Sequence, residues 1–170
     1  MTNLNFIEGF HPESRIWIYQ SSREFMNSEI EKINILINEF TKSWTAHKQE
    51  LKATGKVIMN RFIFLVADET QASASGCSID SSVKFIRELE NQFQTSLLDR
   101  GKMLFEAGGR LIEIPFNELE NKIEASAISG EDFYFNNSIT RLNELQSWKL
   151  KVKDSWIAVR MKTKIVQTIK

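Results

Sequence analysis

The chain has 170 residues, of which 42% are hydrophobic and 26% charged, and this composition excludes an intrinsically disordered protein. The longest uncharged apolar runs, such as residues 62–67, fall far short of the roughly 20 residues needed to span a bilayer. Residues 1–10 lack the basic and apolar regions of a signal peptide. The single cysteine, Cys77, excludes an internal disulfide and a zinc site of several thiolates. We therefore expect a cytoplasmic globular protein with no membrane partner.

Charge is balanced overall but unevenly distributed along the chain. Basic and acidic residues number 22 each, yet residues 149–170 contain seven basic residues and one acidic residue. This segment carries +6 and residues 1–148 carry −6. Such a split indicates a nucleic-acid-binding or membrane-surface tail, or a basic element that packs on or beside an acidic body. Trp156, Ile157 and Val159 favour packing, so nucleic acid is the less favoured partner.

Two amphipathic helices are predicted, over residues 28–48 and 78–97. Ser28 and Glu31 match a capping box at the start of the first helix, and His47 and Lys48 suit its C-terminal end. In both helices apolar residues recur at intervals of three and four. They are Ile30, Ile33, Ile37, Phe40 and Trp44 in the first helix, and Ile79, Val83, Ile86, Leu89, Phe93 and Leu97 in the second.

Strands precede, separate and follow these helices. Alternating or β-branched sequences predict strands over residues 15–20, 51–59, 61–67, 102–105 and 110–114, with turns at residues 59–60 and 108–109. Further along, we expect a short helix over residues 117–127, a strand over residues 133–135 and a helix over residues 140–148. Residues 156–166 fit either a strand or a helix.

The order of these elements, β-α-β-β-α-β with one added strand, is that of the split βαβ or ferredoxin-like arrangement. We therefore predict an α+β fold in which two helices cover one face of an antiparallel sheet. The ferredoxin-like core would span residues 15–114, and residues 115–170 would add a helix and strand extension. No internal repeat or low-complexity linker is present, so residues 1–170 are predicted to be a single domain.

If the chain reverses direction at Asn60, this topology brings three reactive side chains to one edge. The end of the first helix carries His47, the end of the third strand carries Asp68, and the second helix starts beside Cys77. Helix N-termini favour thiolates, so Cys77 would be a nucleophile, His47 its base and Asp68 the group that orients the imidazole. The structural alternative is that Cys77 is a half-buried loop residue and His47 a hydrogen-bonding helix end.

The same edge would suit a small anionic ligand, because backbone N–H groups at a helix start and nearby hydroxyls bind anions. Arg61 or Arg15 would supply a cation, although small polar residues also cap helices without any ligand. The predicted ligand-contacting residues are Trp44, Arg61, Glu69, Ser75, Gly76, Ser78 and Asp80. No His-x-x-x-His spacing supports a metal at His47, so no metal site is predicted and no cofactor is identified.

Common nucleotide-binding and hydrolase motifs are missing from the sequence. Gly55-Lys56 is followed by Val57, and position 50 is Glu, so this pair does not belong to a P-loop. Neither Gly-x-Gly-x-x-Gly nor Gly-x-Ser-x-Gly occurs. The sequence therefore offers no basis for assigning nucleotide hydrolysis.

Seven short segments carry a resemblance to a known family. They are Arg15-Ile-Trp-Ile-Tyr-Gln-Ser, Trp44-Thr-Ala-His47, Asn60-Arg-Phe-Ile63, Asp68-Glu69, Ala74-Ser-Gly-Cys-Ser-Ile-Asp-Ser-Ser82, Phe135-Asn-Asn137 and Ser155-Trp156. Together they resemble a family of small Bacteroidetes proteins that often carry the label "ABC transporter ATPase", which the missing P-loop contradicts. Lys48 departs from the pattern, where glycine is expected. The resemblance implies a bacterial cytoplasmic protein without an established activity.

The sequence supports three interpretations of function. The first is a small-ligand or thiol-based active site at the shared edge. The second is a non-enzymatic interaction module, in which the sheet or the extension forms a homodimer or contacts a protein partner. The third is nucleic-acid binding through the basic residues 149–170.

Overall fold

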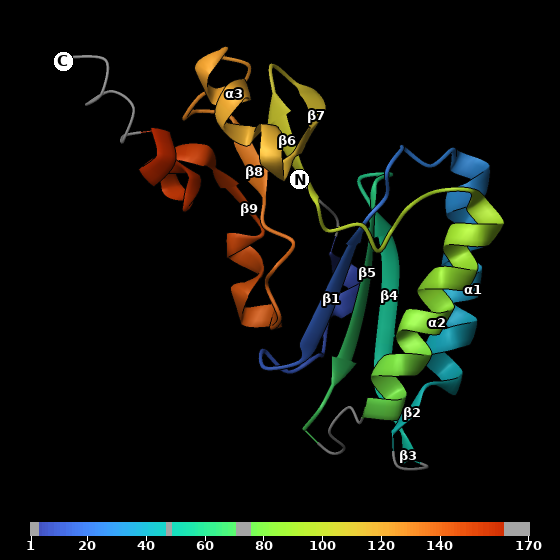
Figure 1. Ribbon diagram of the computed structural model, residues 1–170. Coiled ribbons are helices and arrows are strands. Elements are labelled where there is room, and N and C mark those ends of the chain that lie inside the picture. Colours follow the sequence, from blue (N-terminus) through green and yellow to red (C-terminus); the bar gives the residue numbers. More distant parts are fainter. Residues whose placement is uncertain (1–3, 47–48, 71–75, 162–170) are drawn as a thin grey trace. The chain divides into compact units, whose positions relative to one another are not determined.

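The computed structural model describes residues 4–46, 49–70 and 76–161, and they form an α+β fold (Figure 1). The chain divides into two compact units, one made of residues 1–99 with residues 137–144 and the other of residues 100–136 with residues 145–170. Each unit contains one main antiparallel sheet. The predicted α+β class is confirmed, and the single-domain organisation over residues 1–170 stays a prediction.

The first unit follows the predicted order of elements closely. Its predicted strand over residues 15–20 is confirmed, and so is the predicted hairpin with its turn at residues 59–60. The elements are η1 (Asn5–Ile7), β1 (Arg15–Gln20), α1 (Asn27–Ser43), β2 (Thr45–Ala46), β3 (Gln49–Glu50), β4 (Lys52–Ile58), β5 (Phe62–Asp68) and α2 (Gly76–Phe93).

The main sheet of the first unit has the strand order β1-β5-β4, and α1 and α2 cover one of its faces (Figure 1). Ile63 and Leu65, which alternate along β5, enter the core against the helices. There they meet Ile33 and Ile37 of α1 and Ile86 of α2, all fully buried. The predicted stripes are confirmed in part, at Ile33, Ile37, Ile86, Leu89 and Phe93, which are buried. In α2 the predicted Ile79 and Val83 are only partly buried, and the buried Phe85 lies outside the predicted stripe.

The predicted reversal at Asn60 is confirmed. Met59 and Asn60 have φ angles of 51° and 53°, and the Arg61 N–H donates to the Ile58 carbonyl at 3.1 Å. Positive φ at both central residues is the geometry of a type I′ turn, whose twist matches that of the paired strands. The ends of β5 and of α1 consequently lie at the same end of the sheet.

The first helix ends earlier than the sequence predicts. Helix α1 stops at Ser43, and Trp44 is extended, with ψ of 119°. The Trp44 carbonyl accepts the Leu51 N–H at 2.9 Å, and β2 pairs with β3. Because the backbone after Ser43 pairs across this short hairpin, it cannot continue the helix to residue 48.

The second unit carries the remaining strands and short helices. Its sheet has the order β7-β6-β8-β9, and its core includes the fully buried Phe105, Ile114 and Leu119. The elements are β6 (Lys102–Ala107), β7 (Arg110–Pro115), η2 (Phe116–Glu118), α3 (Leu119–Glu124), β8 (Phe133–Phe135), β9 (Lys149–Lys151) and η4 (Val152–Asp154).

The strand predicted over residues 102–105 does not complete the first sheet, which corrects the predicted extent of the core. Both edges of β6 are occupied, by β7 through the turn at Gly108 and Gly109 and by β8. The open edge of β1 instead receives residues 137–144, where the Ile16 N–H donates to the Thr140 carbonyl at 3.0 Å. The first boundary between the two compact units lies after residue 99.

Later elements agree with the prediction in part. The strand over residues 133–135 is confirmed, whereas the helix expected over residues 117–127 is reduced to η2 and α3. The helix expected over residues 140–148 is a 3₁₀ helix, η3 (Leu142–Ser147), and residues 157–161 are helical. Within the described ranges, no helix combines the length and apolar composition needed to cross a bilayer.

Gly55 lies where α1 packs most closely on β4. A Cβ atom at this position would meet the Phe64 carbonyl oxygen at 2.6 Å, a Leu65 methyl at 2.7 Å and an Ile37 methyl at 2.8 Å. Two of these neighbours are core side chains and one is backbone, so none can move aside cheaply. Packing therefore explains the glycine at position 55, which precedes a lysine as in a P-loop but does not belong to one.

We expect Gly55→Ala to lower the free energy of unfolding by about 1–3 kcal/mol, because the added methyl overpacks the core. Urea unfolding followed by circular dichroism measures the change. Gly130→Ala is the matched control, since its Cβ would meet only Lys153 Cβ at 3.4 Å. Equal stability of Gly55→Ala and the unaltered chain would contradict this packing role.

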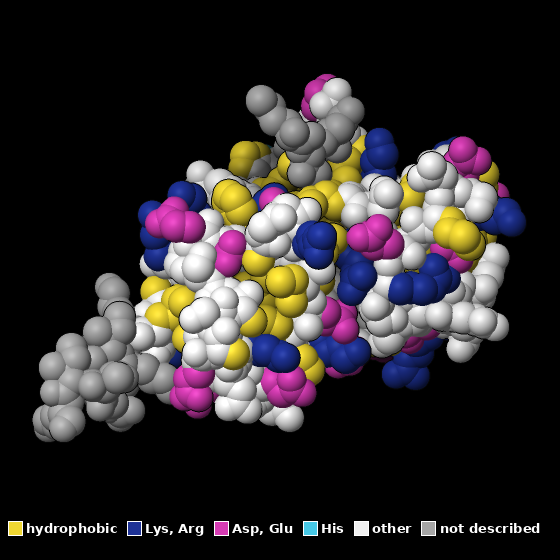
Figure 2. Space-filling model, turned by 90° about the horizontal axis from the view of Figure 1, so that it is seen from above, with side chains coloured by type: hydrophobic (Ala, Val, Ile, Leu, Met, Phe, Trp, Pro, Cys, Tyr) yellow, Lys and Arg dark blue, Asp and Glu magenta, His cyan; other side chains and the backbone are white. Residues whose placement is uncertain are grey.

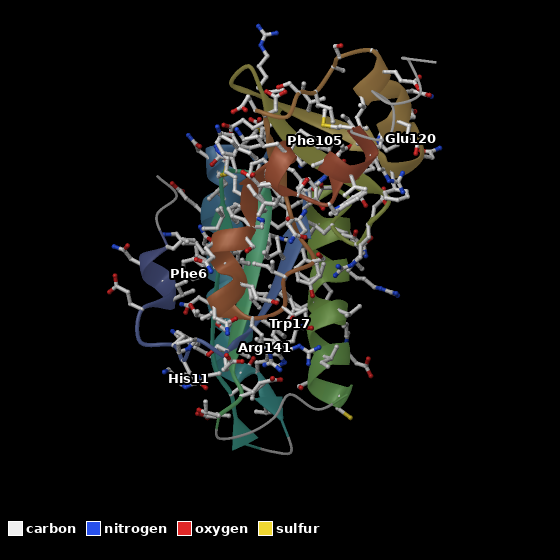
Figure 3. All side chains as sticks on the ribbon, turned by 90° about the vertical axis from the view of Figure 1, so that its left-hand side faces the viewer. Phe6, His11, Trp17, Phe105, Glu120 and Arg141 are labelled. Atoms are coloured by element: carbon white, nitrogen blue, oxygen red, sulfur yellow. The ribbon has the colours of Figure 1, made fainter. Side chains whose placement is uncertain are left out.

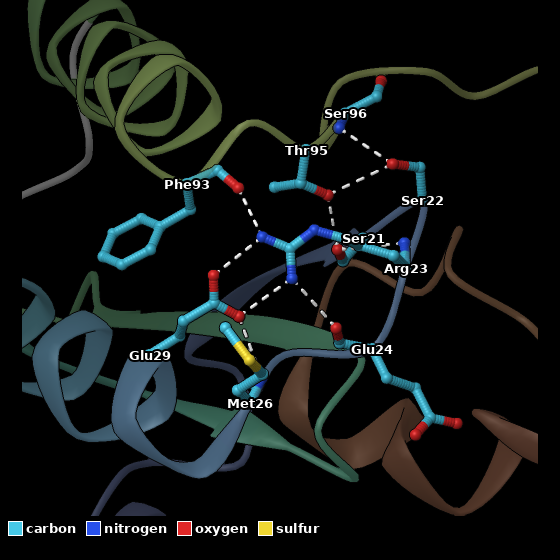
Figure 4. Close-up of polar contacts among 9 residues, drawn as sticks. All are labelled: Ser21, Ser22, Arg23, Glu24, Met26, Glu29, Phe93, Thr95 and Ser96. Atoms are coloured by element: carbon cyan, nitrogen blue, oxygen red, sulfur yellow. Dashed lines mark hydrogen bonds and ion pairs between the residues drawn. The ribbon is translucent and has the colours of Figure 1, made fainter.

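Arg23 forms an ion pair at the start of α1 and a hydrogen bond to the end of α2 (Figure 4). Arg23 binds Glu29 through two hydrogen bonds, of 2.8 and 2.7 Å, and also donates to the Phe93 carbonyl. Glu29 in turn accepts the Met26 N–H at 2.9 Å. The residues that cap the start of α1 are therefore Met26 and Glu29, not the predicted pair Ser28 and Glu31. Arg23 holds the Glu29 carboxylate over the first turn.

These contacts make the ionised form of Glu29 stabilising. The Arg23 hydrogen bond, followed by the Met26 N–H, lowers the pKa of Glu29 from 4.5 to about 2. A carboxylate whose pKa falls on folding stabilises the protein fully above its unfolded pKa, and that stabilisation disappears as the pH falls through its folded pKa. The relevant window therefore runs from pH 4.5 down to about pH 2.

We expect Glu29→Gln to lower the free energy of unfolding at pH 7 by about 1–3 kcal/mol, the range for charge-assisted hydrogen bonds. The variant should also lose part of the fall in stability below pH 4.5. Urea unfolding at neutral and acidic pH tests both effects. Glu31→Gln, at an exposed position of the same helix, is the control, and an equal loss in that variant would contradict the assignment.

Candidate functional site

The predicted edge exists at the end of the first sheet where β5 ends and α2 begins (Figure 1). The buried Trp44 side chain ties this region together, because its indole Nε1–H donates to the Ser78 carbonyl at 2.9 Å. Its ring also packs on Trp17 and Phe40, with centroid distances of 5.4 and 5.0 Å. Trp44 and Ser78 are therefore buried structural contacts of the edge.

Cys77 lies in the first turn of α2 and is exposed. Its carbonyl accepts the Ser81 hydroxyl at 2.8 Å. Gly76 and Asp80, beside it, are exposed as well. His47 and Ser75 lie outside the described residues, so the proposed Cys77–His47 pair stays a prediction.

Asp68 lies on the other face of the sheet. Side chains alternate along a strand, and Leu65 and Ala67 face the helices, so Asp68 faces away from α2. Its carboxylate accepts the Thr70 hydroxyl at 2.7 Å and lies 3.4 Å from Lys52 Nζ. The Thr70 hydrogen bond, more than Lys52, lowers the pKa of Asp68. Asp68 thus faces away from α2 and contacts Lys52 and Thr70. Its predicted role of orienting the His47 ring stays a prediction, because His47 lies outside the described residues.

Arg61 does not belong to this edge, which corrects its predicted place in the ligand site. It follows the turn at Asn60 and therefore lies at the opposite end of β5, about 20 Å from Asp68 for a strand of this length. Its guanidinium donates to the Ser22 carbonyl at 3.2 Å.

Arg15 takes the place of Arg61 as the cation of the edge, together with Arg141. The Glu69 carboxylate lies 3.8 Å from Arg15 Nη1 and 3.0 Å from Arg141 Nη1. Arg15 stacks over the Trp17 ring, with Cζ at 5.0 Å from the centroid. Figure 3 shows Trp17 and Arg141 close together at this end of β1. We call Arg15, Trp17, Glu69 and Arg141 the arginine cluster.

The backbone of residues 137–144 positions Arg141. Arg15 and Arg141 form a β-bridge, and the Leu142 N–H donates to the Ser14 carbonyl at 3.0 Å. Glu144 accepts the Thr140 N–H at 2.7 Å and the Arg141 N–H at 2.9 Å, and these two bonds, the Thr140 bond first, lower the pKa of Glu144. The backbone of Arg141 is thus held beside β1.

The arginine cluster has hydrogen-bond donors to spare. The Arg15 guanidinium carries five N–H groups but donates no hydrogen bond to any residue in the described ranges. Arg141 uses Nη1 for the Glu13 carbonyl, at 2.9 Å, and for Glu69. Guanidinium groups bind carboxylates and phosphates through paired N–H bonds, so the cluster has the chemistry of an anion site.

Unlike the Arg15 guanidinium, the described cations of the basic segment, residues 149–160, are hydrogen-bonded to carboxylates. These side chains are paired with acidic groups of the same unit, and acidic and basic side chains are interspersed on the face shown in Figure 2. The pairs are Lys149–Glu106 at 2.8 Å, Lys151–Glu131 and Lys153–Glu131 at 2.6 Å, and Arg160–Glu120 at 3.1 Å. Packing of this segment beside acidic residues is confirmed for residues 149–160.

Comparisons with other proteins add no assignment. No family model, curated protein or solved structure matches the chain. The resemblance to the Bacteroidetes family therefore stays a prediction. Across residues 4–46, 49–70 and 76–161, no three His, Cys, Asp or Glu side chains are grouped so that they could hold a metal ion.

Proposed function

We propose that the protein binds a small anionic ligand, bearing a carboxylate or a phosphate, at the arginine cluster. The observation that carries this proposal is the state of Arg15. Its side chain is oriented by stacking on Trp17, yet it donates no hydrogen bond to a described residue. Orienting a guanidinium without filling its donors leaves it ready for a ligand, because the entropy of ordering the side chain is already lost.

Glu69 occupies part of this site in the absence of a ligand. Its side chain is only 14% exposed and contacts both arginines, so it balances their charge. Ion pairs between partly exposed groups contribute little, roughly 0.2–1 kcal/mol. A ligand that forms paired hydrogen bonds with Arg15 and Arg141 would therefore outcompete Glu69 or share the arginines with it.

A thiol-based reaction is a second candidate function, favoured by the exposure of Cys77 at the start of α2. We propose Cys77 as its nucleophile and His47 as its base. Asp68 is left out, because it faces the opposite side of the sheet and pairs with Lys52. The resemblance to bacterial cytoplasmic proteins supports a cytoplasmic location for either function.

We also propose that the first unit is a ferredoxin-like arrangement without its fourth strand. The order β1-β5-β4, with two helices on one face, is consistent with three strands and both helices of that arrangement. Residues 137–144 would then replace the fourth strand at the edge of β1. Their pairing is short, so Arg141 reaches the arginine cluster from a loop instead of from a regular strand.

Titration of the ¹⁵N-labelled protein with inorganic phosphate and with succinate tests anion binding. We expect saturable shifts of the Trp17 indole signal, and loss of at least about tenfold in affinity in Arg15→Ala. Glu69→Gln should bind roughly two- to fivefold more tightly, because it removes the competing carboxylate. Arg110→Ala, at an exposed position of the second unit, is the control. Shifts that persist unchanged in Arg15→Ala would refute the site.

Alkylation of Cys77 by iodoacetamide tests the thiol-based reaction. If His47 activates the thiol, His47→Gln should slow alkylation at pH 7 by at least about tenfold, because the thiolate is the reacting form. His11→Gln controls for the change of residue type, since His11 lies in another loop. Equal rates in His47→Gln and the unaltered chain would remove the catalytic pair and leave anion binding untouched.

A further inference from the structure

The second unit exposes large apolar side chains at its surface. Phe116 is 50% exposed, Trp156 is 43% exposed and Val159 is 67% exposed. The rings of Phe116 and Trp156 lie 6.1 Å apart, and Val159 follows Trp156 by three residues at the start of a helical turn. Isolated exposed apolar residues are common on protein surfaces, but a contiguous group of large ones marks an interaction site.

A charged pair lies across these rings. Arg160 Cζ is 5.4 Å from the ring centroids of both Phe116 and Trp156, and Arg160 Nη1 lies 3.1 Å from Glu120 Oε1. We call Phe116, Glu120, Trp156, Val159 and Arg160 the aromatic–arginine patch. Trp and Arg are the residue types most often found as energetic hot spots of protein interfaces.

The patch is held in a fixed conformation before any partner arrives. Trp156 contacts the buried Tyr134 edge to face, with centroids 6.4 Å apart. Arg160 is restrained by two rings and one carboxylate at once. Side chains that are already ordered lose little conformational entropy on association, so this surface is preorganised for binding.

We propose that the aromatic–arginine patch is the interface of a homodimer, in which a second copy of the chain docks on it about a two-fold axis. A two-fold interface uses the same patch on both copies, so that patch must be complementary to itself. Arg160 and Glu120 are adjacent and of opposite sign, so a two-fold rotation sets Arg160 of each copy against Glu120 of the other. The exposed rings of Phe116 and Trp156 then stack across the axis and lose their contact with water.

Charge complementarity favours a second copy over a polyanionic partner. The short helix beside the patch, α3, carries Glu120 and Glu124, and Glu118 directly precedes it. These carboxylates would repel a nucleic acid or an acidic peptide, whereas the dimer matches each charge with its opposite. The inference concerns the second unit alone and does not depend on the anion site of the first.

Sedimentation equilibrium of the full chain, at concentrations up to roughly 500 μM, measures the dimer dissociation constant. Arg160→Glu and Glu120→Arg should each weaken the dimer by at least about tenfold, because each places like charges across the axis. The double variant should restore dimerisation, and a mixture of the two single variants should form heterodimers. Lys102→Glu, which reverses the charge in a different ion pair of the same unit, should have no such effect.

Unfolding curves of the single variants establish that each is folded. The double variant keeps the ion pair between positions 120 and 160 within each copy, with the two charges exchanged. A chain that remains monomeric over the whole concentration range leaves the patch to another occupant, such as its own residues 162–170, and overturns the proposal. A dimer whose dissociation constant is unchanged in both single variants overturns it equally, since another surface must then join the copies.

Discussion

The pairing of residues 137–144 with the open edge of β1 is the contact on which the first unit and its candidate site both depend. Two backbone hydrogen bonds, Ile16 N–H to Thr140 and Leu142 N–H to Ser14, hold this segment beside the sheet. They satisfy backbone groups that an unpaired edge strand would otherwise leave to solvent or to another chain. The same bonds place Arg141 across from Arg15. Closure of the sheet edge and assembly of the arginine cluster are thus one structural event.

Local patterns in the sequence predicted the elements well because each was determined by nearby residues. The strand over residues 15–20 and the reversal at Asn60 follow from β-branched alternation and turn geometry, which act over a few residues. The segment that pairs with the open edge of β1 could not be predicted in the same way. Pairing of Arg15 with Arg141 joins residues far apart in the chain, and the helical pattern of residues 140–148 concealed it.

The sequence predicted which end of the sheet Asp68 and Glu69 reach, but not the faces on which their side chains lie. Asp68 and Glu69 both come to the predicted edge, yet adjacent residues of a strand point to opposite faces. Asp68 consequently pairs with Lys52 on one face, while Glu69 meets Arg15 and Arg141. All of β5 is buried and residues 62–67 are uniformly apolar, so no alternation in the sequence could have assigned Asp68 to one face. Arg141 had no local signal either, because its role depends on the tertiary pairing of its backbone.

The arginine cluster and the aromatic–arginine patch expose different chemical groups, and each therefore suits a different kind of partner. At the arginine cluster, hydrogen-bond donors outnumber the acceptors that the described residues offer, so the group that completes it must bring acceptor oxygens and negative charge. At the aromatic–arginine patch, Arg160 and Glu120 already neutralise each other, and apolar ring surface is what remains exposed. An anion would gain little there, whereas a second apolar surface with matched charges would remove that ring area from water. Among the described basic residues of the segment, Lys149, Lys151, Lys153 and Arg160, acidic groups of the same unit offset the charge that a polyanion would need.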